Sequence, residues 1–296
     1  MNKILILLTT LLIVFLPSEA IEEENELYFE EERCEDFQSM SKTCAEVYAR
    51  MTFGKMIGVD DSYSTMGVWA FREESDYLYF LDGRFHHISN GGNGLNVGTG
   101  IRFGDIHRGC GINLYYDWRN MHSTNLSQIQ IGLEGWLCPW EYRFNAYIPL
   151  QSIEHYSQKK SSYPGDFVFH TTKTLYPCRM ASLLMGRKFN YELCDCVDLY
   201  FTALAGPYWI SNRKNRNRYG VLANIDLCIN EIISLKTLFS YDPIFHSRTA
   251  GILVSLTIPF FCNYERENQC SKPLYYSIPE RLDLIPVKDK TSCSNN

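Results

Sequence analysis

Apolar and polar residues alternate along most of this chain, from about residue 63 to residue 260. Between Arg218 and Asn230, the odd-numbered residues are all apolar, whereas the even-numbered residues are mostly polar or small. Because successive side chains of a β-strand point to opposite faces, such a segment has one apolar and one polar face. The pattern predicts an all-β protein. Twelve segments carry it, at residues 63–72, 77–88, 95–105, 109–118, 126–137, 140–149, 166–176, 180–190, 197–209, 218–229, 233–242 and 249–260.

The length and polarity of these segments favour a membrane barrel over a soluble sandwich. Most have about 10 to 13 residues, which suits tilted strands that cross a bilayer, whereas soluble strands average about five or six. Aromatic residues often lie near the segment ends, as in the girdles of membrane barrels. The polar faces carry charges that suit a wet lumen: Arg102, Asp117, Glu134, Arg143 and Asp226. We expect a transmembrane antiparallel β-barrel of about 12 strands over residues 61–260, with a disulfide-bonded secreted β-sandwich as the alternative.

The start of the chain predicts export. Lys3 precedes an apolar run, and Ser18-Glu19-Ala20 gives a small-x-small cleavage pattern, so residues 1–20 are interpreted as a secretory signal peptide. The alternative is an uncleaved anchor helix, but the apolar run is shorter than the ~20 residues that a membrane span needs.

The segments on either side of the expected barrel have a different character. Residues 21–60 are predicted to be an acidic N-terminal periplasmic segment, in which Asp36 to Met51 could form a short helix. Residues 261–296 form a C-terminal tail that contains cysteines, and its stretch from Leu274 to Val287 could dock on the barrel or the cell wall.

Charge and cysteine content limit the partners. The net charge of -6 argues against nucleic acid, which would require a basic surface. In an exported chain most of the 11 cysteines are expected to pair, and the odd number leaves at least one free or bonded to another envelope protein. Cys194-Asp195-Cys196 is a candidate metal or redox motif, although structural pairing is the better interpretation. A disulfide through Cys262 or Cys270 would fit a cross-linked envelope role.

No catalytic, cofactor-binding or metal-binding residue is assigned, and the chain is not predicted to be an enzyme. His86 and His87 lie near Asp82 and Arg84, but adjacent strand residues point to opposite faces, so the two rings cannot bind one metal ion. The glycines of residues 91–94 lack the Lys-Ser/Thr of a phosphate-binding loop and instead indicate a hairpin turn. The basic residues Arg213, Lys214, Arg216 and Arg218 could contact anionic lipid or simply form a solvated loop.

Three consecutive segments carry a family resemblance: G-I-N-L-Y-Y-D at Gly111–Asp117, I-Q-I-G-L-E at Ile129–Glu134 and R-F-N-A-Y-I-P at Arg143–Pro149. This succession resembles the β-domain of inverse autotransporters, the intimin and invasin family. The resemblance implies a Sec-exported, twelve-stranded barrel in the outer membrane of a Gram-negative-type bacterium. It also implies that outer-membrane lipid and the barrel-assembly and secretion machinery are partners.

In that family a helical linker threads the lumen and carries a C-terminal adhesive passenger to the cell surface. Only about 36 residues follow Phe260, too few for an immunoglobulin-like domain of ~100 residues. The adhesin role is therefore not carried over. Three hypotheses remain: an inverse-autotransporter-type barrel with a surface or envelope role, a small porin-like channel, and an outer-membrane enzyme, which the absent motifs disfavour. A filled lumen would favour the first over the second.

Overall fold

A computed structural model describes the chain from residue 42 onward, with short internal gaps. The described ranges are 42–59, 61–121, 124–152, 154–163, 167–194, 197–211, 217–229, 232–242, 247–262 and 274–295. The predicted signal peptide and the first part of the acidic segment lie outside these residues. In the part of the chain that the structure describes, no helix is long and apolar enough to cross a membrane.

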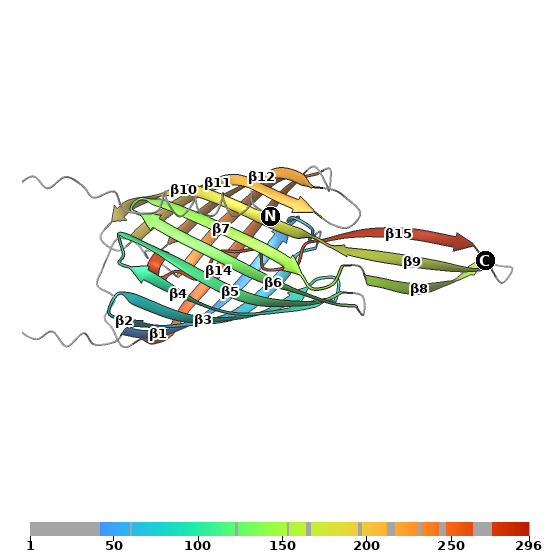
Figure 1. Cartoon of the computed structure of the whole chain (residues 1–296), viewed down its shortest axis with the longest axis horizontal. Helices are drawn as coiled ribbons and strands as arrows, with labels where there is room; N and C mark the ends of the chain where they lie inside the picture. The colour runs from blue at the N-terminus through green and yellow to red at the C-terminus, as the bar shows by residue number, and fades with distance from the viewer. Residues whose placement is uncertain are drawn as a thin grey trace, which may run out of the picture. The chain divides into compact units, whose positions relative to one another are not determined.

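Twelve antiparallel strands close into a barrel (Figure 1). Around the barrel the order is β1-β14-β13-β12-β11-β10-β7-β6-β5-β4-β3-β2. Their bounds are β1 Lys42–Gly54, β2 Tyr63–Glu74, β3 Tyr77–Ile88, β4 Asn93–Gly104, β5 Arg108–Met121, β6 Thr124–Leu137, β7 Trp140–Pro149, β10 Arg179–Cys194, β11 Val197–Ser211, β12 Arg218–Ile229, β13 Ile233–Asp242 and β14 Ser247–Cys262. The predicted fold class and strand number are confirmed.

The predicted number of barrel strands is correct, but one barrel strand was not predicted and one predicted strand lies outside the barrel. The predicted barrel began at residue 61, but the structure places Lys42–Gly54 in the barrel, paired with both β14 and β2. A short helix was expected over Asp36 to Met51, and the described part of that stretch is strand. Helix-favouring residues such as Ala45, Glu46 and Ala49 obscured an alternation in which the odd positions face outward.

The predicted segment at 166–176 is a strand, but it is not part of the barrel wall. It corresponds to β9 (Phe167–Pro177), which pairs with β8 (Glu154–Tyr163) and β15 (Val287–Asn295) in a separate three-stranded sheet of order β15-β9-β8. This hairpin is inserted between the neighbouring barrel strands β7 and β10. Alternation alone cannot tell a strand in lipid from one in an external hairpin, which explains the error.

The outer surface of the barrel is apolar, as the alternation predicts. Large apolar side chains are exposed along the strands at Val47, Met66, Leu81, Val97, Leu114, Ile131, Ile148, Met185, Val221, Leu235 and Val254. A soluble protein does not expose a continuous apolar surface of this size, whereas a membrane barrel requires one. The outer face is therefore the face that contacts lipid.

The two ends of the barrel differ in their connections. At the end where β1 begins and β14 ends, the connections between strands are two or three residues long, and we call it the short-turn end. These connections are residues 75–76, 105–107, 138–139, 195–196 and 230–232. At the opposite end, the loop end, lie the eight-residue connection 55–62, the six-residue connection 212–217 and the β8–β9 insertion.

The turn between β4 and β5 at the short-turn end is tightly bonded. The Asp105 carboxylate accepts hydrogen bonds from the backbone N–H groups of His107 and Arg108, at 2.7 and 2.9 Å, and these bonds lower the pKa of Asp105. Trp136 donates its indole N–H to the Asp105 carbonyl at 2.8 Å. These bonds hold the turn between β4 and β5 against the end of β6.

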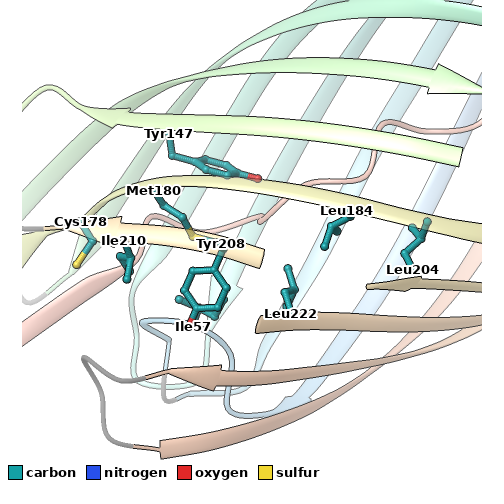
Figure 2. Packing of buried hydrophobic residues seen from close by; sticks show 9 residues of the cluster. All are labelled: Ile57, Tyr147, Cys178, Met180, Leu184, Leu204, Tyr208, Ile210 and Leu222. Atoms are coloured by element: carbon teal, nitrogen blue, oxygen red, sulfur yellow. The ribbon is translucent and has the colours of Figure 1, made fainter. Parts of the chain in front are cut away.

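Inside the barrel, apolar contacts gather near the loop end of β10 and β11 (Figure 2). The cluster joins Tyr147 of β7, residues of β10, β11 and β12, and Ile57 from the 55–62 connection. Its members are Ile57, Tyr147, Cys178, Met180, Leu184, Leu204, Tyr208, Ile210 and Leu222. Leu282, which belongs to the C-terminal tail, packs against the same cluster. The interior is thus partly closed by apolar packing, and the tail takes part in it.

The opposite placement of two neighbouring residues on β12 provides a test of the membrane assignment. Ile225 is 38 % exposed on the outer surface, whereas Asn224 is buried in the lumen. Ile225→Arg is expected to lower the free energy of unfolding by about 2–4 kcal/mol if the site is near the bilayer midplane. Asn224→Arg should cost much less, because that side chain lies beside the Glu280 carboxylate and lines a cavity. Denaturant titration of the protein in lipid vesicles measures both, and equal costs would contradict the assignment.

Candidate functional site

The C-terminal tail enters the barrel lumen and fills much of it. Near the short-turn end, Tyr275 packs on Trp136 with ring centroids 5.9 Å apart, and the Tyr276 hydroxyl donates to Glu73 at 2.8 Å. At the loop end, the Cys178 N–H donates to the Pro286 carbonyl at 2.9 Å, and the Val287 N–H donates to the Gly58 carbonyl. Residues 275–287 therefore run from the short-turn end to the loop end. Only one short 3₁₀ turn, η1 (Leu274–Tyr276), interrupts this path before β15 begins.

The barrel wall binds the tail largely through the tail's backbone carbonyls. Arg102 of β4 donates to the carbonyls of Tyr275 and Ser277, at 2.8 and 2.7 Å. Further along, Arg84 donates to the Pro279 carbonyl at 2.7 Å.

Closer to the loop end, the same mode continues. Asn96 donates to the Asp283 carbonyl and Arg119 donates to the Ile285 carbonyl, both at 2.7 Å. A buried carbonyl without a partner costs free energy, so these side chains make it possible for an irregular backbone to lie inside the barrel.

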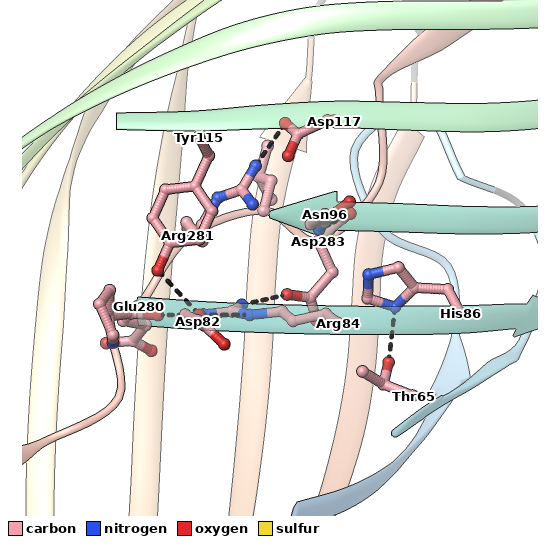
Figure 3. Close-up of polar contacts among 12 residues, drawn as sticks. Thr65, Asp82, Arg84, His86, Asn96, Tyr115, Asp117, Glu280, Arg281 and Asp283 are labelled. Carbon is pink, nitrogen blue, oxygen red and sulfur yellow. Dashed lines mark hydrogen bonds and ion pairs between the residues drawn. The ribbon is translucent and has the colours of Figure 1, made fainter. Parts of the chain in front are cut away.

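A buried ion-pair network joins the wall to the tail at the centre of the lumen (Figure 3). Arg84 of β3 donates to Asp82 with Nε and Nη2, at 2.8 and 2.6 Å, and to the tail residue Asp283 with Nη1, at 2.6 Å. The Asp82 carboxylate also accepts hydrogen bonds from Tyr48 and Tyr115, at 2.8 and 2.7 Å. Arg84 and Asp82 therefore each have several partners and Asp283 has a cation, which is the condition for keeping these charges away from water.

Glycines on neighbouring strands make room for the two tyrosines. A Cβ atom at Gly67 or Gly98 would lie 2.2 Å from the ring of Tyr48 or Tyr115, respectively. Only glycine allows each ring to lie against the adjacent strand with its hydroxyl directed at Asp82.

Two further charged residues of the tail contact other parts of the wall. Arg281 forms a buried ion pair with Asp117 of β5. Glu280 is paired with Arg143 of β7 and Lys236 of β13. The tail is thus held from several sides of the barrel rather than along a single strand.

A cavity of about 150 Å³, lined by both polar and apolar side chains, remains beside the tail, on the β10–β14 side of the lumen. Asn224, Asp226 and Lys236 line it from the wall, and Glu280 to Asp283 line it from the tail. Its volume corresponds to several water molecules. The lumen therefore holds a pocket next to the tail, with charged and amide side chains on part of its wall.

A disulfide joins the first and last strands of the barrel. Cys44 of β1 is bonded to Cys262 of β14 at the short-turn end, and the two residues are also partners in the strand register. The bond closes the β1–β14 seam close to the point where the chain leaves the barrel wall. Cys262 was considered for a link to another envelope protein, but its partner lies within the chain.

The structure brings together most of the lumen charges that the sequence singled out. Arg102 pairs with Glu134 at 2.8 Å, and Asp117 and Arg143 both contact the tail, whereas Asp226 faces the cavity. His86 is buried and His87 is exposed, so the two rings point to opposite faces as predicted.

Sequence reasoning missed the ion pair between Arg84 and Asp283. Arg84 was noted only as a neighbour of the histidines, and the stretch that contains Asp283 was expected to dock without a defined place. The available sequence signal for Arg84 was its place on the same face of the segment as Asp82 and His86. No local signal identifies the partner of Asp283, because the two residues are 199 positions apart.

Two of the remaining candidate motifs lie mostly outside the described residues. Of the Cys194-Asp195-Cys196 motif, only the backbone of Cys194 at the end of β10 is described. Residues 213, 214 and 216 of the basic loop also lie outside the described ranges. The fourth basic residue, Arg218, is exposed at the start of β12. Gly91 and Gly92 lie in the predicted turn between β3 and β4, whereas Gly94 belongs to β4.

Comparison with known proteins supports the resemblance noted in the sequence. Residues 42–164 match the family model of the inverse autotransporter β-domain. Among curated proteins no sequence match was found.

Among solved structures, one shares the fold at low sequence identity, and two autotransporter domains are more distantly similar. One comes from a study of the "Mechanism Behind the in-meso Crystallization of Membrane Proteins"; it is 13 % identical with a TM-score of 0.57, and covers 83 % of this chain and 100 % of its own. The β-domain of the Bordetella autotransporter BrkA is 14 % identical with a TM-score of 0.34, covering 73 % and 97 %. The translocator domain of NalP from Neisseria meningitidis is 12 % identical with a TM-score of 0.37, covering 74 % and 88 %.

The Arg84 network allows a direct test of the tail's place in the barrel. Arg84→Ala leaves the buried carboxylates of Asp82 and Asp283 without their cation, and we expect it to lower the free energy of unfolding by about 3–5 kcal/mol. Arg72→Ala breaks only the exposed pair with Glu74 and should cost less than about 1 kcal/mol. Unfolding curves of the detergent-solubilised protein give both values. A cost for Arg84→Ala as small as that for Arg72→Ala would refute the network.

Proposed function

We propose that this outer-membrane barrel, which carries an inverse autotransporter β-domain at residues 42–164, is a sealed surface protein that delivers its own C-terminal segment through its lumen to the cell exterior. The observation that carries the proposal is the course of residues 275–287, which enter at the short-turn end and leave at the loop end. Outside the barrel this segment continues as β15 and pairs with β9. We assign the protein a structural or adhesion-related role at the cell envelope and no catalytic activity.

The direction of the tail follows from the connections between strands. Outer-membrane barrels have short turns on the periplasmic side and longer loops on the extracellular side. On this basis the short-turn end, with the Cys44–Cys262 disulfide, faces the periplasm, where disulfides form and persist. The loop end, with the β8–β9–β15 sheet, faces the outside. The tail then crosses the membrane inside the barrel, from the periplasm outward.

A filled lumen favours this function over the alternative of a small channel. The carbonyl contacts of Arg84, Arg102 and Arg119, together with the Arg84–Asp283 pair, fix the tail in the path that ions would take. The contacts are buried and charge-assisted, which makes them strong compared with neutral hydrogen bonds. A tail held in this way acts as a plug rather than as a loose constriction.

The β15 strand supports the idea that the exported segment has a place of its own outside the barrel. It pairs with β9 over nine residues, from Val287 opposite Pro177 to Asn295 opposite Phe169. The β8–β9 hairpin alone would have two strands, and such hairpins are marginally stable in water. The exported strand supplies the third strand of this sheet.

Surface labelling tests the proposed topology. An epitope tag added after Asn296 should be detected by antibody on intact cells, because β15 lies on the outer side in the proposed orientation. A tag inserted between Ser75 and Asp76, in the β2–β3 turn, should be detected only after the outer membrane is permeabilised. Flow cytometry of tagged cells before and after permeabilisation measures both.

The two tags serve as controls for each other, since each reports on one end of the same barrel. If the tag after Asn296 is hidden in intact cells and the tag in the β2–β3 turn is exposed, the orientation is reversed. If both are hidden, the barrel does not deliver the tail, and the proposed function fails.

A further inference from the structure

The charged residues of the tail within the lumen lie within four consecutive positions, and each faces a different part of the wall. Between Tyr275 and Val287 the only charged side chains are Glu280, Arg281 and Asp283, which we call the charge cassette. Arg281 faces Asp117 and Asp283 faces Arg84 (Figure 3). Glu280 faces Arg143 and Lys236. All three cassette residues are thus matched by opposite charges.

Apart from the hydroxyl of Tyr276, which donates to Glu73, the other polar contacts of the tail involve its backbone and do not depend on which residue occupies a position. Arg84, Arg102, Asn96 and Arg119 donate to backbone carbonyls, and every residue has a carbonyl. A tail displaced by one or two residues would still offer carbonyls to these donors. Backbone contacts alone therefore leave the position of the tail along the lumen poorly defined.

The charge cassette removes this ambiguity, because each small displacement brings like charges together. An outward shift by one residue would place Glu280 opposite Asp117, and an outward shift by two would place Arg281 opposite Arg84. An inward shift by one would place Arg281 opposite Arg143 and Lys236. An inward shift by two would place Asp283 opposite Asp117. Like charges in contact away from water are strongly unfavourable, so all four displaced positions are disfavoured.

We infer that the lumen wall is a binding site for a peptide segment of pattern Glu-Arg-x-Asp, and that the charge cassette sets the register at which the tail stops in the barrel. The side chains that donate to the carbonyls bind the segment whatever its sequence. Its charged residues are selected by four charged residues of the wall: Arg84, Asp117, Arg143 and Lys236. The inference rests on the proposed function, because a stop position matters only for a tail that moves through the lumen.

Photo-crosslinking in the full-length protein tests the register. A diazirine-bearing amino acid replaces Leu282, which packs against the cluster that contains Tyr147 and Leu184 and lines the cavity. In the otherwise unchanged chain, crosslinks should be confined to the strands that carry this cluster, β7, β10, β11 and β12. In the variant Glu280→Gln, Arg281→Gln, Asp283→Asn, the yield at these sites should fall roughly tenfold and spread to other lumen residues, because the charge-assisted contacts that select one register are lost. Mass spectrometry of the crosslinked peptides gives the sites.

A matched control changes the same number and sign of charges outside the lumen. Arg72→Gln, Glu74→Gln, Asp76→Asn alters exposed residues at the short-turn end and should leave the crosslinks unchanged. The milder variant Arg281→Lys keeps the charge opposite Asp117 and should retain the original sites. It also covers the case in which the triple variant fails to fold, because Arg281→Gln can then be compared with Arg281→Lys.

The outcomes separate this inference from the proposed function. Crosslinks that stay at the original sites after the cassette is neutralised would overturn the inference, although the tail would still be threaded. An equal loss with Arg281→Lys and Arg281→Gln would also overturn it, since charge would then not be the selecting property. Crosslinks that are absent from the lumen even in the unchanged chain would overturn the proposed function itself.

Discussion

Charges that are removed from water must be paired, and this constraint couples the barrel wall of this protein to its tail. The lumen strands carry arginines and carboxylates at positions where an open barrel would leave them hydrated. Once the tail fills the lumen, Arg84 needs both Asp82 and Asp283, and Asp117 needs Arg281. Removing one member of such a buried pair leaves an uncompensated charge, which costs more than the pair itself contributes. The tail and wall therefore depend on each other for their polar interior.

The outer surface obeys the opposite constraint, because lipid offers no partner for polar groups. Apolar side chains cover the barrel exterior, and the closed ring of twelve strands leaves no unpaired strand edge within the wall. The disulfide between Cys44 and Cys262 lies at the seam where the first strand meets the last. The seam closes the ring, and the described tail residues nearest to this end, Tyr275 and Tyr276, lie inside the lumen.

Much of the barrel could be predicted from the sequence, because a period of two is a local signal. Ile225 and Asn224 were placed on opposite faces by alternation alone, and Arg102, Asp117, Glu134 and Arg143 were correctly assigned to the lumen. The first strand was missed because residues such as Ala45 and Ala49 favour a helix without tertiary contacts, whereas pairing with β2 and β14 decides the outcome. The place of β9 could not be found from its own residues, since it depends on its pairing with β15.

The course of the tail was the least predictable feature. Its segment from Leu274 to Val287 has almost no regular secondary structure, and its partners lie far away in the sequence. Local patterns report propensity and amphipathicity, but they do not report which distant carbonyl an arginine will bind. The resemblance to inverse autotransporters suggested a lumen-threading linker of helical form. The structure instead fills the lumen with an irregular segment whose carbonyls are bound by the wall.

Planar-bilayer conductance of the purified full-length protein tests the central claim, that the tail seals the barrel, most directly. A chain truncated after Cys262 provides the comparison, because it keeps all twelve barrel strands and lacks the segment that fills the lumen. We predict that the full-length protein inserts without a steady ion current, whereas the truncated barrel conducts. A steady current of the same size from both proteins would contradict the claim, since the tail would then leave the lumen open.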